Sequence, residues 1–395
     1  MNILFCNYEY PPLGGGGGVV MAALARSLAR RHSVTVLTSR ALDLPAESDD
    51  GGVRVLRVPV FFRRDLATAN FTSMLAYLPS AFVRGLALRK RAFDVINTHF
   101  VVPTGPVGQA LALALGVPNV LSVHGGDLFD PSKRSSPHRQ PWLRRPIRWL
   151  LEKADAVVAQ SRDTMKHVSD IYGVGRTIDL IPLGIERPVP VRDADRDYFL
   201  LPRDAQVLVT VGRLVPRKNT TQLVRALTDP RLARTHLLVV GDGPDAANIR
   251  QAAHDAGIAQ RVHLLGFLSD ADKHRALAVA DVFVSTSQHE GFGLVFLEAM
   301  AFGLPVVCYD HGGQTDFLAT GETGSVVRLD DLEAFIDAVV GLAAPAHRAR
   351  IRANNLEKVE HFFIDRCAER YEAVFRKVLD APRTSSRPAR MSRAR

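Results

Sequence analysis

The chain of 395 residues exceeds the size at which a single hydrophobic core usually stops growing, so we expect two domains. Hydrophobic residues make up 47% and charged residues 23%, as in ordinary soluble globular proteins, and three scattered cysteines exclude a disulfide framework. The net charge of +9 is uneven: residues 1–185 contain 22 Lys and Arg against 14 Asp and Glu, whereas residues 186–381 contain 23 against 27. The basic first half favours an anionic partner (a membrane surface, a phosphorylated lipid or nucleic acid), with a solvated basic face as the alternative.

The first residues predict a cytoplasmic protein. Residues 1–6 lead directly into a predicted strand and lack the basic start and cleavage site of a signal peptide. The longest stretch without Asp, Glu, Lys or Arg, residues 95–126, is interrupted by Pro103, Pro106 and Pro118. It therefore predicts strand, helix and strand in a buried parallel sheet rather than a transmembrane helix.

In chain order, short apolar runs alternate with amphipathic segments of helical length. The expected strands of the first half are residues 2–7, 34–38, 53–58, 94–98, 119–123 and 156–159, with helices at 19–31, 104–115 and 141–152. The expected strands of the second half are residues 207–211, 236–240, 262–265, 282–285 and 305–308. This alternation predicts βαβ units, and two such series predict an α/β protein of two Rossmann-like, doubly wound domains.

A run rich in proline and charge at residues 183–203 marks the domain boundary. We expect an N-terminal domain at 1–185 and a C-terminal domain at 186–360. A helix at 361–381, predicted to pack back on the N-terminal domain, and a disordered basic tail at 382–395 complete the chain.

The second half has the sharper functional signals. Gly212, Arg213 and Lys218 follow the predicted strand 207–211, and the carboxyl ends of parallel strands are where doubly wound sheets bind ligands. Two cations at such a turn suit a diphosphate, because Arg offers a planar fork and Lys a mobile point charge. A charged surface loop is the alternative for this motif alone.

The segment 287–301 is the strongest signal. Gly291, Phe292 and Gly293 precede a helix predicted to begin at Leu294, whose free amides suit an anion. Glu290 and Glu298 flank these residues, and a carboxylate there is suited to accept hydrogen bonds from sugar or ribose hydroxyls. An exposed helical position for Glu298 and a helix-start position for Glu290 are the alternatives.

Weaker signals follow neighbouring strands. Gly241 opens a glycine turn where backbone can approach a ligand, and Phe267 could border a flat nucleotide base, although a packed turn is an equal alternative. The turn at residues 311–313 could present backbone amides to the same ligand.

In the first half, the glycines at 14–18 follow a strand but lack the spacing of a dinucleotide fingerprint. His124, after strand 119–123, could donate a hydrogen bond to a reacting sugar, and Asp127 could orient His124 or receive a proton from an acceptor hydroxyl. A structural histidine is the alternative. The Asp-X-Asp patterns at Asp193/Asp195 and Asp270/Asp272 are interpreted as linker and helix start, so we expect no metal site and no cofactor.

Together these elements resemble the retaining glycosyltransferases of family 4, which have the two-domain GT-B fold with a central cleft. The most specific part is the pair Glu290 and Glu298 around Gly-Phe-Gly; the motifs at 212–218, 241–244, 124–125 and 14–18 add to it. The resemblance implies an acceptor-binding N-terminal domain and a nucleotide-sugar-binding C-terminal domain.

The resemblance also implies roles for individual residues. Arg213 and Lys218 would hold the donor diphosphate and stabilise the leaving nucleotide, as a metal ion does in other transferases. Glu298 would bind ribose, while Glu290 and the amides of Phe292, Gly293 and Leu294 would hold the transferred sugar. His124 would contact that sugar on cleft closure. Gly15 or Gly16 would face diphosphate and acceptor, and Gly212, Gly241 and Phe267 would border the donor.

The acceptor is not readable from these motifs. Apolar and basic residues mix at residues 61–64, 66–91 and 133–148, which suits either an anionic membrane or a packed helix with basic residues in water. A peripheral position on the inner face of the cytoplasmic membrane would fit a lipid-linked acceptor.

The sequence therefore predicts hexose transfer from a UDP- or GDP-sugar to a saccharide or lipid-linked acceptor, in envelope or exopolysaccharide synthesis, without a nucleic-acid partner. The alternatives are a nucleotide-sugar epimerase, which would not need the two glutamates, and a non-enzymatic nucleic-acid-binding or membrane-binding protein, which leaves the second-half motifs unused. A phosphorylase would need a cofactor lysine and a longer chain.

Overall fold

The computed structural model describes residues 1–41, 43–63, 70–191 and 195–382. Arg64, Asp193, residues 66–69 of the apolar and basic segment, and residues 383–395 of the expected tail lie outside the described residues. The chain divides into two compact units, one of Met1–Gly184 with Ile364–Arg395 and one of Ile185–Phe363. The helix Ile364–Asp380 (α12) thus belongs to the same unit as the N-terminal residues.

The first unit is built on an eight-stranded sheet of order β3-β4-β2-β1-β5-β6-β7-β8. All its strand pairs are parallel except β3 with β4. The strands are β1 Asn2–Cys6, β2 Ser33–Arg40, β3 Glu47–Asp50, β4 Val53–Pro59, β5 Val95–His99, β6 Asn119–Val123, β7 Ala156–Ala159 and β8 Asp179–Leu180.

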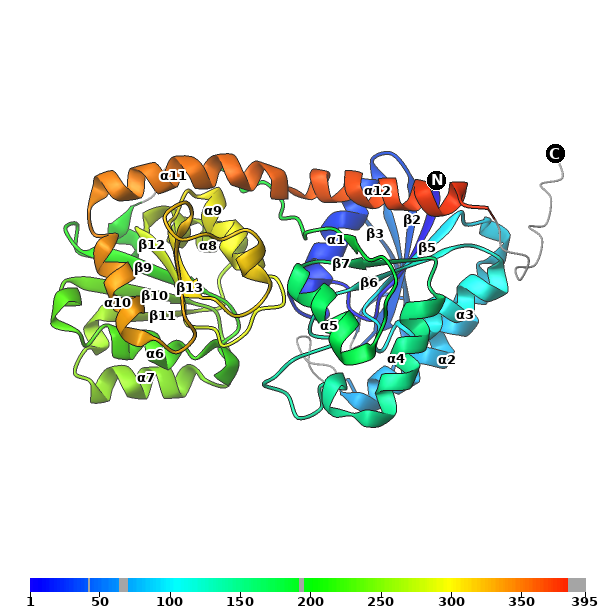
Figure 1. Cartoon of the computed structure of the whole chain (residues 1–395), viewed down its shortest axis with the longest axis horizontal. Coiled ribbons are helices and arrows are strands. Elements are labelled where there is room, and N and C mark those ends of the chain that lie inside the picture. The colour runs from blue at the N-terminus through cyan, green and yellow to red at the C-terminus, as the bar shows by residue number, and fades with distance from the viewer. Residues whose placement is uncertain (42, 64–69, 192–194, 383–395) are drawn as a thin grey trace. The chain divides into compact units, whose positions relative to one another are not determined.

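Successive side chains of a strand point to opposite faces of this sheet, and helices cover both faces. Ile3 and Phe5 join the core beneath α1 and α12, whereas Leu4 and Cys6 join the core beneath α2 and α3. Because both faces of β1 and β7 are buried, these two strands are mostly apolar, as expected for a parallel sheet. The helices of this unit are α1 Gly16–Ala29, α2 Phe71–Ala87, α3 Gly105–Leu115, α4 Pro141–Lys153, α5 Arg162–Tyr172 and α12 (Figure 1).

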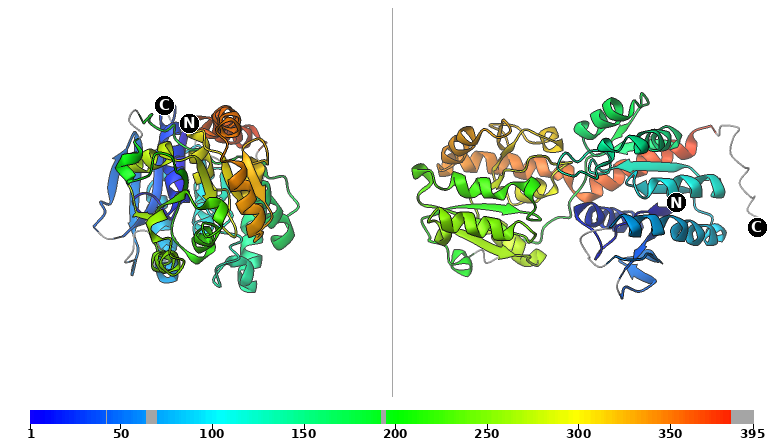
Figure 2. Two further views of the ribbon diagram at one scale, coloured as in Figure 1. Left: turned by 90° about the vertical axis from the view of Figure 1, so that its left-hand side faces the viewer. Right: turned by 90° about the horizontal axis from the view of Figure 1, so that it is seen from below.

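The second unit has a six-stranded, wholly parallel sheet of order β11-β10-β9-β12-β13-β14. Its order reverses between β9 and β12, the point at which doubly wound sheets bind ligands. The strands are β9 Gln206–Val211, β10 Thr235–Val240, β11 Val262–Gly266, β12 Val282–Ser285, β13 Val306–Tyr309 and β14 Gly324–Val327. The helices are α6 Thr220–Ala226, α7 Ala246–Asp255, α8 Asp270–Val279, α9 Leu294–Ala301, α10 Leu332–Gly341 and α11 Pro345–Val359; Figures 1 and 2 show helices on both faces of the sheet.

The predicted fold class, two Rossmann-like α/β domains, is confirmed. The strands β3, β8 and β14 were not predicted from the sequence. The edge strand β3 has the sequence Glu-Ser-Asp-Asp and is held by antiparallel pairing with β4 rather than by its own propensity. Among the described residues, no helix is long and apolar enough to cross a bilayer.

Candidate functional site

In the second unit, the loops that follow β9, β10 and β11 are joined by backbone hydrogen bonds. The Gly212 amide donates to Val240 (2.9 Å), and the Gly241 amide donates to Gly266 (2.8 Å). A Cβ on Gly241 would lie 1.9 Å from the Gly212 carbonyl oxygen, so a side chain at Gly241 would separate the loops. Gly241, in the turn predicted to approach a ligand, is therefore required for the contact between these loops.

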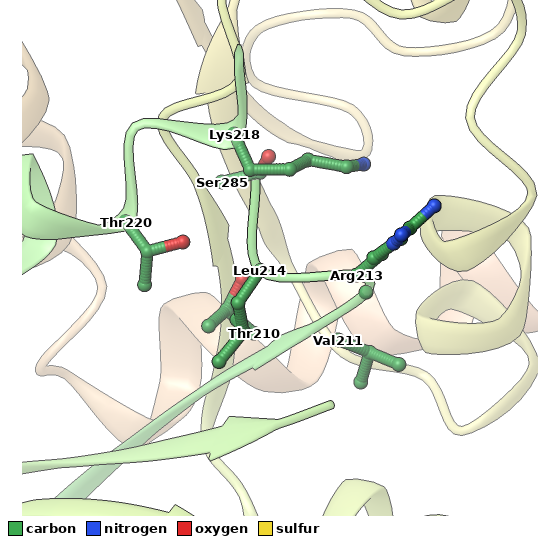
Figure 3. A pocket seen from close by; sticks show the side chains of 8 residues that line it. Thr210, Val211, Arg213, Leu214, Lys218, Thr220 and Ser285 are labelled. Carbon is green, nitrogen blue, oxygen red and sulfur yellow. The ribbon is translucent and has the colours of Figure 1, made fainter. Parts of the chain in front are cut away.

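A small pocket lies at the carboxyl end of β9. It is lined by Thr210, Val211, Gly212, Arg213, Leu214, Lys218, Thr220 and Ser285. Figure 3 shows the side chains of Arg213 and Lys218 extending to the same side of the loop. Arg213 is exposed and forms no hydrogen bond or ion pair with any residue that the structure describes. The two predicted phosphate-binding cations therefore share one pocket.

Lys218 is held there by Glu290. The Lys218 ammonium contacts Oε1 of Glu290, and the Arg217 guanidinium lies 3.5 Å from Oε2. Arg217 also donates to the backbone carbonyl of His289, which precedes Glu290. The structure thus brings together two predicted residues, Lys218 and Glu290, and adds Arg217, which the sequence analysis did not select.

Two opposing effects set the charge of Glu290. Burial raises its pKa, but the charges of Lys218 and Arg217 and the hydrogen bond from Lys218 more than offset this and lower the pKa to about 2. Glu290 is therefore a carboxylate at neutral pH, able only to accept hydrogen bonds.

The backbone of Glu290 is fixed by the turn after β13. The Gly313 amide donates to the Glu290 carbonyl oxygen at 2.8 Å. A Cβ on Gly312, which has φ +126°, would lie 2.1 Å from that oxygen. The sequence predicted that the backbone amides of this turn face a ligand. At least one of them, the Gly313 amide, holds the backbone of Glu290.

Helix α9 begins immediately beyond this cluster. Gly293 caps it in a left-handed conformation, φ +92°, and no side chain caps its first amides. Leu294 is its first residue, as predicted. Phe292 is buried and packs against Phe317 with ring centroids 5.2 Å apart, so its side chain belongs to the core and only its backbone is suited to bind a ligand.

Glu298, one turn into α9, pairs with a residue that the sequence analysis missed. Nζ of Lys273 on α8 lies 3.1 Å from Glu298 and 3.0 Å from Asp270. Burial lowers the pKa of Lys273, but the two carboxylates outweigh burial and the net shift is upward. Asp270 lies in the first turn of α8, which Ser269 caps, as the sequence indicated.

Phe267 follows β11 on the loop that Gly266 begins. Its side chain is 88% exposed, more than that of any other aromatic residue that the structure describes. It packs into no core cluster that the structure describes. The exposed ring of Phe267 is therefore available for the predicted contact with a nucleotide base.

In the first unit, the glycine loop contacts two other residues. The Gly15 amide donates to Glu9 at 3.2 Å, and a Cβ on Gly14 would collide with the same carboxylate group. A Cβ on Gly17 would lie 2.6 Å from the Phe100 ring. At Gly15, by contrast, a Cβ would meet no atom within 4 Å. Gly15 and Gly16, the two predicted positions, are both exposed and accessible to a ligand.

Phe100 connects this loop to His124, because their ring centroids are 4.3 Å apart. Asp127 holds the His124 loop: its carboxylate accepts the amides of His124 (2.9 Å) and Val101 (2.6 Å). This geometry favours the orienting role for Asp127 over the proton-accepting one. Burial raises the pKa of Asp127 to about 6.

His124 is buried, and Nε2 lies 2.9 Å from Nδ1 of His99 on β5. Burial lowers the pKa of His124 to about 4 and lowers that of His99 as well, so both rings are neutral at pH 7. Sequence reasoning missed His99; its position at the end of the strand before β6 was the available signal.

Among the described residues, no group of three or more His, Cys, Asp or Glu side chains is arranged to hold a metal ion. The catalytic and donor-binding roles assigned from the sequence remain predictions. What the geometry adds is that Lys218 lines one pocket with Gly212 and Arg213 and also pairs with Glu290, while Glu298 pairs separately with Lys273.

Comparison with known proteins identifies relatives along the whole chain. The family model "Glycosyl transferases group 1" matches residues 191–356, and "Glycosyltransferase Family 4" matches residues 14–187. A GDP-mannose-dependent alpha-(1-6)-phosphatidylinositol monomannoside mannosyltransferase of Mycobacterium tuberculosis is 31% identical over 88% of this chain and 90% of its own length. A D-inositol 3-phosphate glycosyltransferase of Stackebrandtia nassauensis is 30% identical over 90% of this chain and 85% of its own length.

Solved structures show the same fold. Sucrose-phosphate synthase from Thermosynechococcus elongatus matches with a TM-score of 0.83 and 24% identity, over 96% of this chain and 99% of the other. Anabaena HepE in complex with UDP-glucose matches with a TM-score of 0.74 and 20% identity, over 95% of this chain and all of the other.

Proposed function

Because the chain belongs to the family 4 glycosyltransferases, we propose that it is a retaining, metal-independent hexosyltransferase that uses a UDP- or GDP-sugar. Its acceptor is a saccharide or a lipid-linked saccharide of cell-envelope or exopolysaccharide synthesis. Family membership supports a transferase over the epimerase and the non-enzymatic alternatives considered from the sequence.

The cluster of Lys218, Arg213 and Glu290 carries this proposal. Lys218 and Arg213 supply two positive charges at the carboxyl end of β9, where a nucleoside diphosphate would develop negative charge as the glycosidic bond breaks. Glu290, ionised and nearly buried, accepts hydrogen bonds from the hydroxyls of the transferred sugar. Glu298 accepts those of the ribose.

The choice of donors rests on the relatives. The mannosyltransferases of Mycobacterium tuberculosis and Mycolicibacterium smegmatis are named as GDP-mannose-dependent, and HepE was solved with UDP and UDP-glucose. GDP-mannose and UDP-glucose are therefore the first donors to test here.

A thermal-shift screen with UDP, GDP, ADP and their sugars, each with and without EDTA, tests the proposal. We expect one nucleotide to raise the Tm, EDTA to leave the rise unchanged, and Lys218→Ala to abolish it. Lys358→Ala is the matched control, because Lys358 pairs with Glu322 (3.6 Å) away from the pocket residues. No rise with any nucleotide would contradict donor binding, and a rise lost in EDTA would contradict metal independence.

Stereochemistry is tested separately. With the donor identified, proton NMR of the first product formed gives the anomeric configuration. We expect the configuration of the donor to be kept, and inversion would contradict the retaining mechanism.

A lipid-linked acceptor would bring the protein to a membrane surface, and helix α4 is the element suited to contact it. Trp142 and Trp149 are 61% and 47% exposed and, with Arg145, recur at the spacing of one helix face. Arg145 has no ion-pair partner among the described residues, and Arg144, Arg148 and the preceding Arg139 are also exposed. Arg148 pairs with Glu152 at 2.7 Å, so Arg145 carries the argument. Exposed tryptophans beside Arg145 suit the headgroup region of an anionic bilayer, so we propose that α4 rests on such a surface.

Within the segments at 61–64 and 66–91, Arg89, Lys90 and Arg91 are exposed, but two other arginines do not contribute to a membrane surface. Arg63 is buried, with its guanidinium 5.2 Å from the Tyr8 ring centroid, and Arg84 pairs with Glu47. These two arginines are structural. Phe71 and Leu75 on α2 are exposed and form the rival apolar patch.

Cosedimentation with vesicles of phosphatidylcholine, with and without phosphatidylglycerol, tests the surface. We expect binding that requires the anionic lipid, weakens with salt and falls at least tenfold in Trp142→Ala/Trp149→Ala. Phe71→Ala/Leu75→Ala and the exposed Tyr198→Ala in the other unit should bind as wild type. Equal binding of the tryptophan variant, or loss only in the α2 variant, would contradict the assignment to α4.

A further inference from the structure

A chain of buried polar side chains lies behind His124. Asn97 and His99, both on β5, are at most 1% exposed. Oδ1 of Asn97 lies 2.8 Å from Nε2 of His99, and Nδ1 of His99 lies 2.9 Å from Nε2 of His124. These contacts determine which ring nitrogens carry hydrogen.

The direction of the chain starts at Asn97. Its Nδ2 lies 3.0 Å from the carbonyl oxygen of Val120 and 3.0 Å from Oγ of Ser122. A carbonyl oxygen only accepts, so the atom facing it must be the amide nitrogen, and a flipped amide would place two acceptors in contact. Oδ1 of Asn97 therefore faces His99 as an acceptor, and Nε2 of His99 donates to it.

The hydrogen on Nε2 of His99 fixes the next two atoms. A neutral imidazole with hydrogen on Nε2 has a lone pair on Nδ1, and a second charge-bearing proton is disfavoured in a fully buried ring. Nδ1 of His99 then accepts, so Nε2 of His124 donates. In a neutral His124 the remaining nitrogen, Nδ1, keeps its lone pair.

That nitrogen is buried and forms no hydrogen bond of acceptable geometry with the residues that the structure describes. The neighbouring polar group is the amide of Gln160: its Nε2 donates to the His124 carbonyl oxygen at 2.7 Å, and its Oε1, an acceptor, is also buried without a partner among the described residues. A buried polar atom without a partner destabilises a folded protein, and a bound ligand is one of the groups that can satisfy it. A neutral hydrogen-bond donor is the chemistry that matches a buried, unprotonated imidazole nitrogen. The hydroxyl group is that donor in a saccharide.

We propose that Asn97 and His99 are positioning residues that hold His124 as a hydrogen-bond acceptor, through Nδ1, for a hydroxyl group of a sugar substrate. The identity of the ligand as a sugar rests on the proposed function. The direction of the hydrogen bond is the reverse of the donating role predicted for His124 from the sequence.

The tautomer can be read without substrate. In protein labelled with ¹⁵N-histidine, we expect His124 at pH 7 to show a protonated Nε2 and an unprotonated Nδ1, its signals being assigned by their loss in His124→Phe. In His99→Phe, which keeps an aromatic ring against Phe5 (centroids 5.4 Å apart), His124 should populate both tautomers. A protonated Nδ1 in the wild type would overturn the proposal, whatever the turnover.

Kinetics then test the consequence. We expect His99→Phe to lower Tm, because Oδ1 of Asn97 loses its donor and Nε2 of His124 its acceptor. In protein that is folded at the assay temperature, we expect kcat/KM to fall by about tenfold or more, because the partner of a substrate hydroxyl is lost in part of the population. His99→Gln, whose amide oxygen can accept from Nε2 of His124, should recover part of that loss. His263→Phe is the matched control, since it removes one ring of another histidine pair (His236 and His263, 3.0 Å apart) on β10 and β11.

Wild-type kcat/KM in His99→Phe would also overturn the positioning role. Absence of turnover with every nucleotide sugar would instead contradict the transferase proposal, and the tautomer measurement would still decide the assignment of Asn97 and His99.

Discussion

Lys218 and Glu290 form a largely buried ion pair between the loop after β9 and the loop before α9, with side chains 17% and 9% exposed. Each is 72 residues from the other in sequence, so the pair exists only because β9 and β12 are neighbours in the sheet. The pair holds the ammonium of Lys218 in the pocket beside Arg213, and it keeps Glu290 ionised.

Removing either member of the pair should abolish turnover. In Lys218→Ala the diphosphate loses one of two cations, and in Glu290→Ala the sugar loses an acceptor, so we expect kcat to fall by about 10²-fold or more in each, the loss typical of a removed transition-state contact. Arg225→Ala on α6 is the control for loss of a charge in the same unit. Rates like those of the wild type in both variants, measured with the donor found by thermal shift, would contradict the roles given to both residues.

The same pair predicts how stability depends on pH. The pKa of Glu290 is lowered from 4.5 to about 2 in the folded protein, so its contribution is fully present above pH 4.5 and is lost as the pH falls through about 2. The contribution is about 3 kcal/mol at neutral pH, from about 1.4 kcal/mol per pKa unit. Urea unfolding at pH 7 and at pH 3 should show the difference between wild type and Glu290→Gln shrinking with acidity. A difference independent of pH would contradict this origin of the stability.

The loops around the pocket should tolerate side chains unequally. Gly241→Ala places a Cβ 1.9 Å from the Gly212 carbonyl oxygen, whereas at Gly257, also in the left-handed region with φ +66°, a Cβ meets no atom within 4 Å. Both substitutions strain the backbone, by about 1 kcal/mol. We expect Gly241→Ala to cost clearly more free energy of unfolding than Gly257→Ala, and to weaken nucleotide binding, which Gly257→Ala should not. Equal costs would show that the two loops can move apart.

The sequence predicted most of the sheets because buried parallel strands are largely apolar runs, and it located the candidate site where glycines and charges follow those runs. It could not predict partners that only the strand order creates. Lys273 meets Glu298 because α8 and α9 are neighbours in space, and His99 meets His124 because β5 pairs with β6. The sequence analysis did not select Arg217, because the sequence Pro-Arg-Lys does not indicate which of the two cations faces a carboxylate distant in the chain.

The same limit applies to glycines. Within the run at 14–18, Gly15 or Gly16 was expected to face a ligand, and contacts with Glu9 and Phe100 account for Gly14 and Gly17. A glycine required by a neighbouring side chain and a glycine required by a ligand look alike in one sequence. The space around each glycine in the structure separates the two cases, and a Cβ at Gly15 would meet no atom within 4 Å.

Phe267 gives a prediction that separates binding from folding. Its side chain is 88% exposed, so Phe267→Ala should leave Tm unchanged within about one degree, since surface substitutions rarely change stability by more than about 0.5 kcal/mol. If the ring stacks on the nucleotide base, its loss should weaken nucleotide binding by about 5- to 150-fold, because base–aromatic stacking contributes about 1–3 kcal/mol. Phe267→Tyr should bind as wild type, and Tyr198→Ala, another exposed aromatic of this unit, should have no effect on affinity. Isothermal titration with the preferred nucleoside diphosphate measures these affinities. An unchanged affinity in Phe267→Ala would remove Phe267 from the donor site and leave its exposure to another explanation.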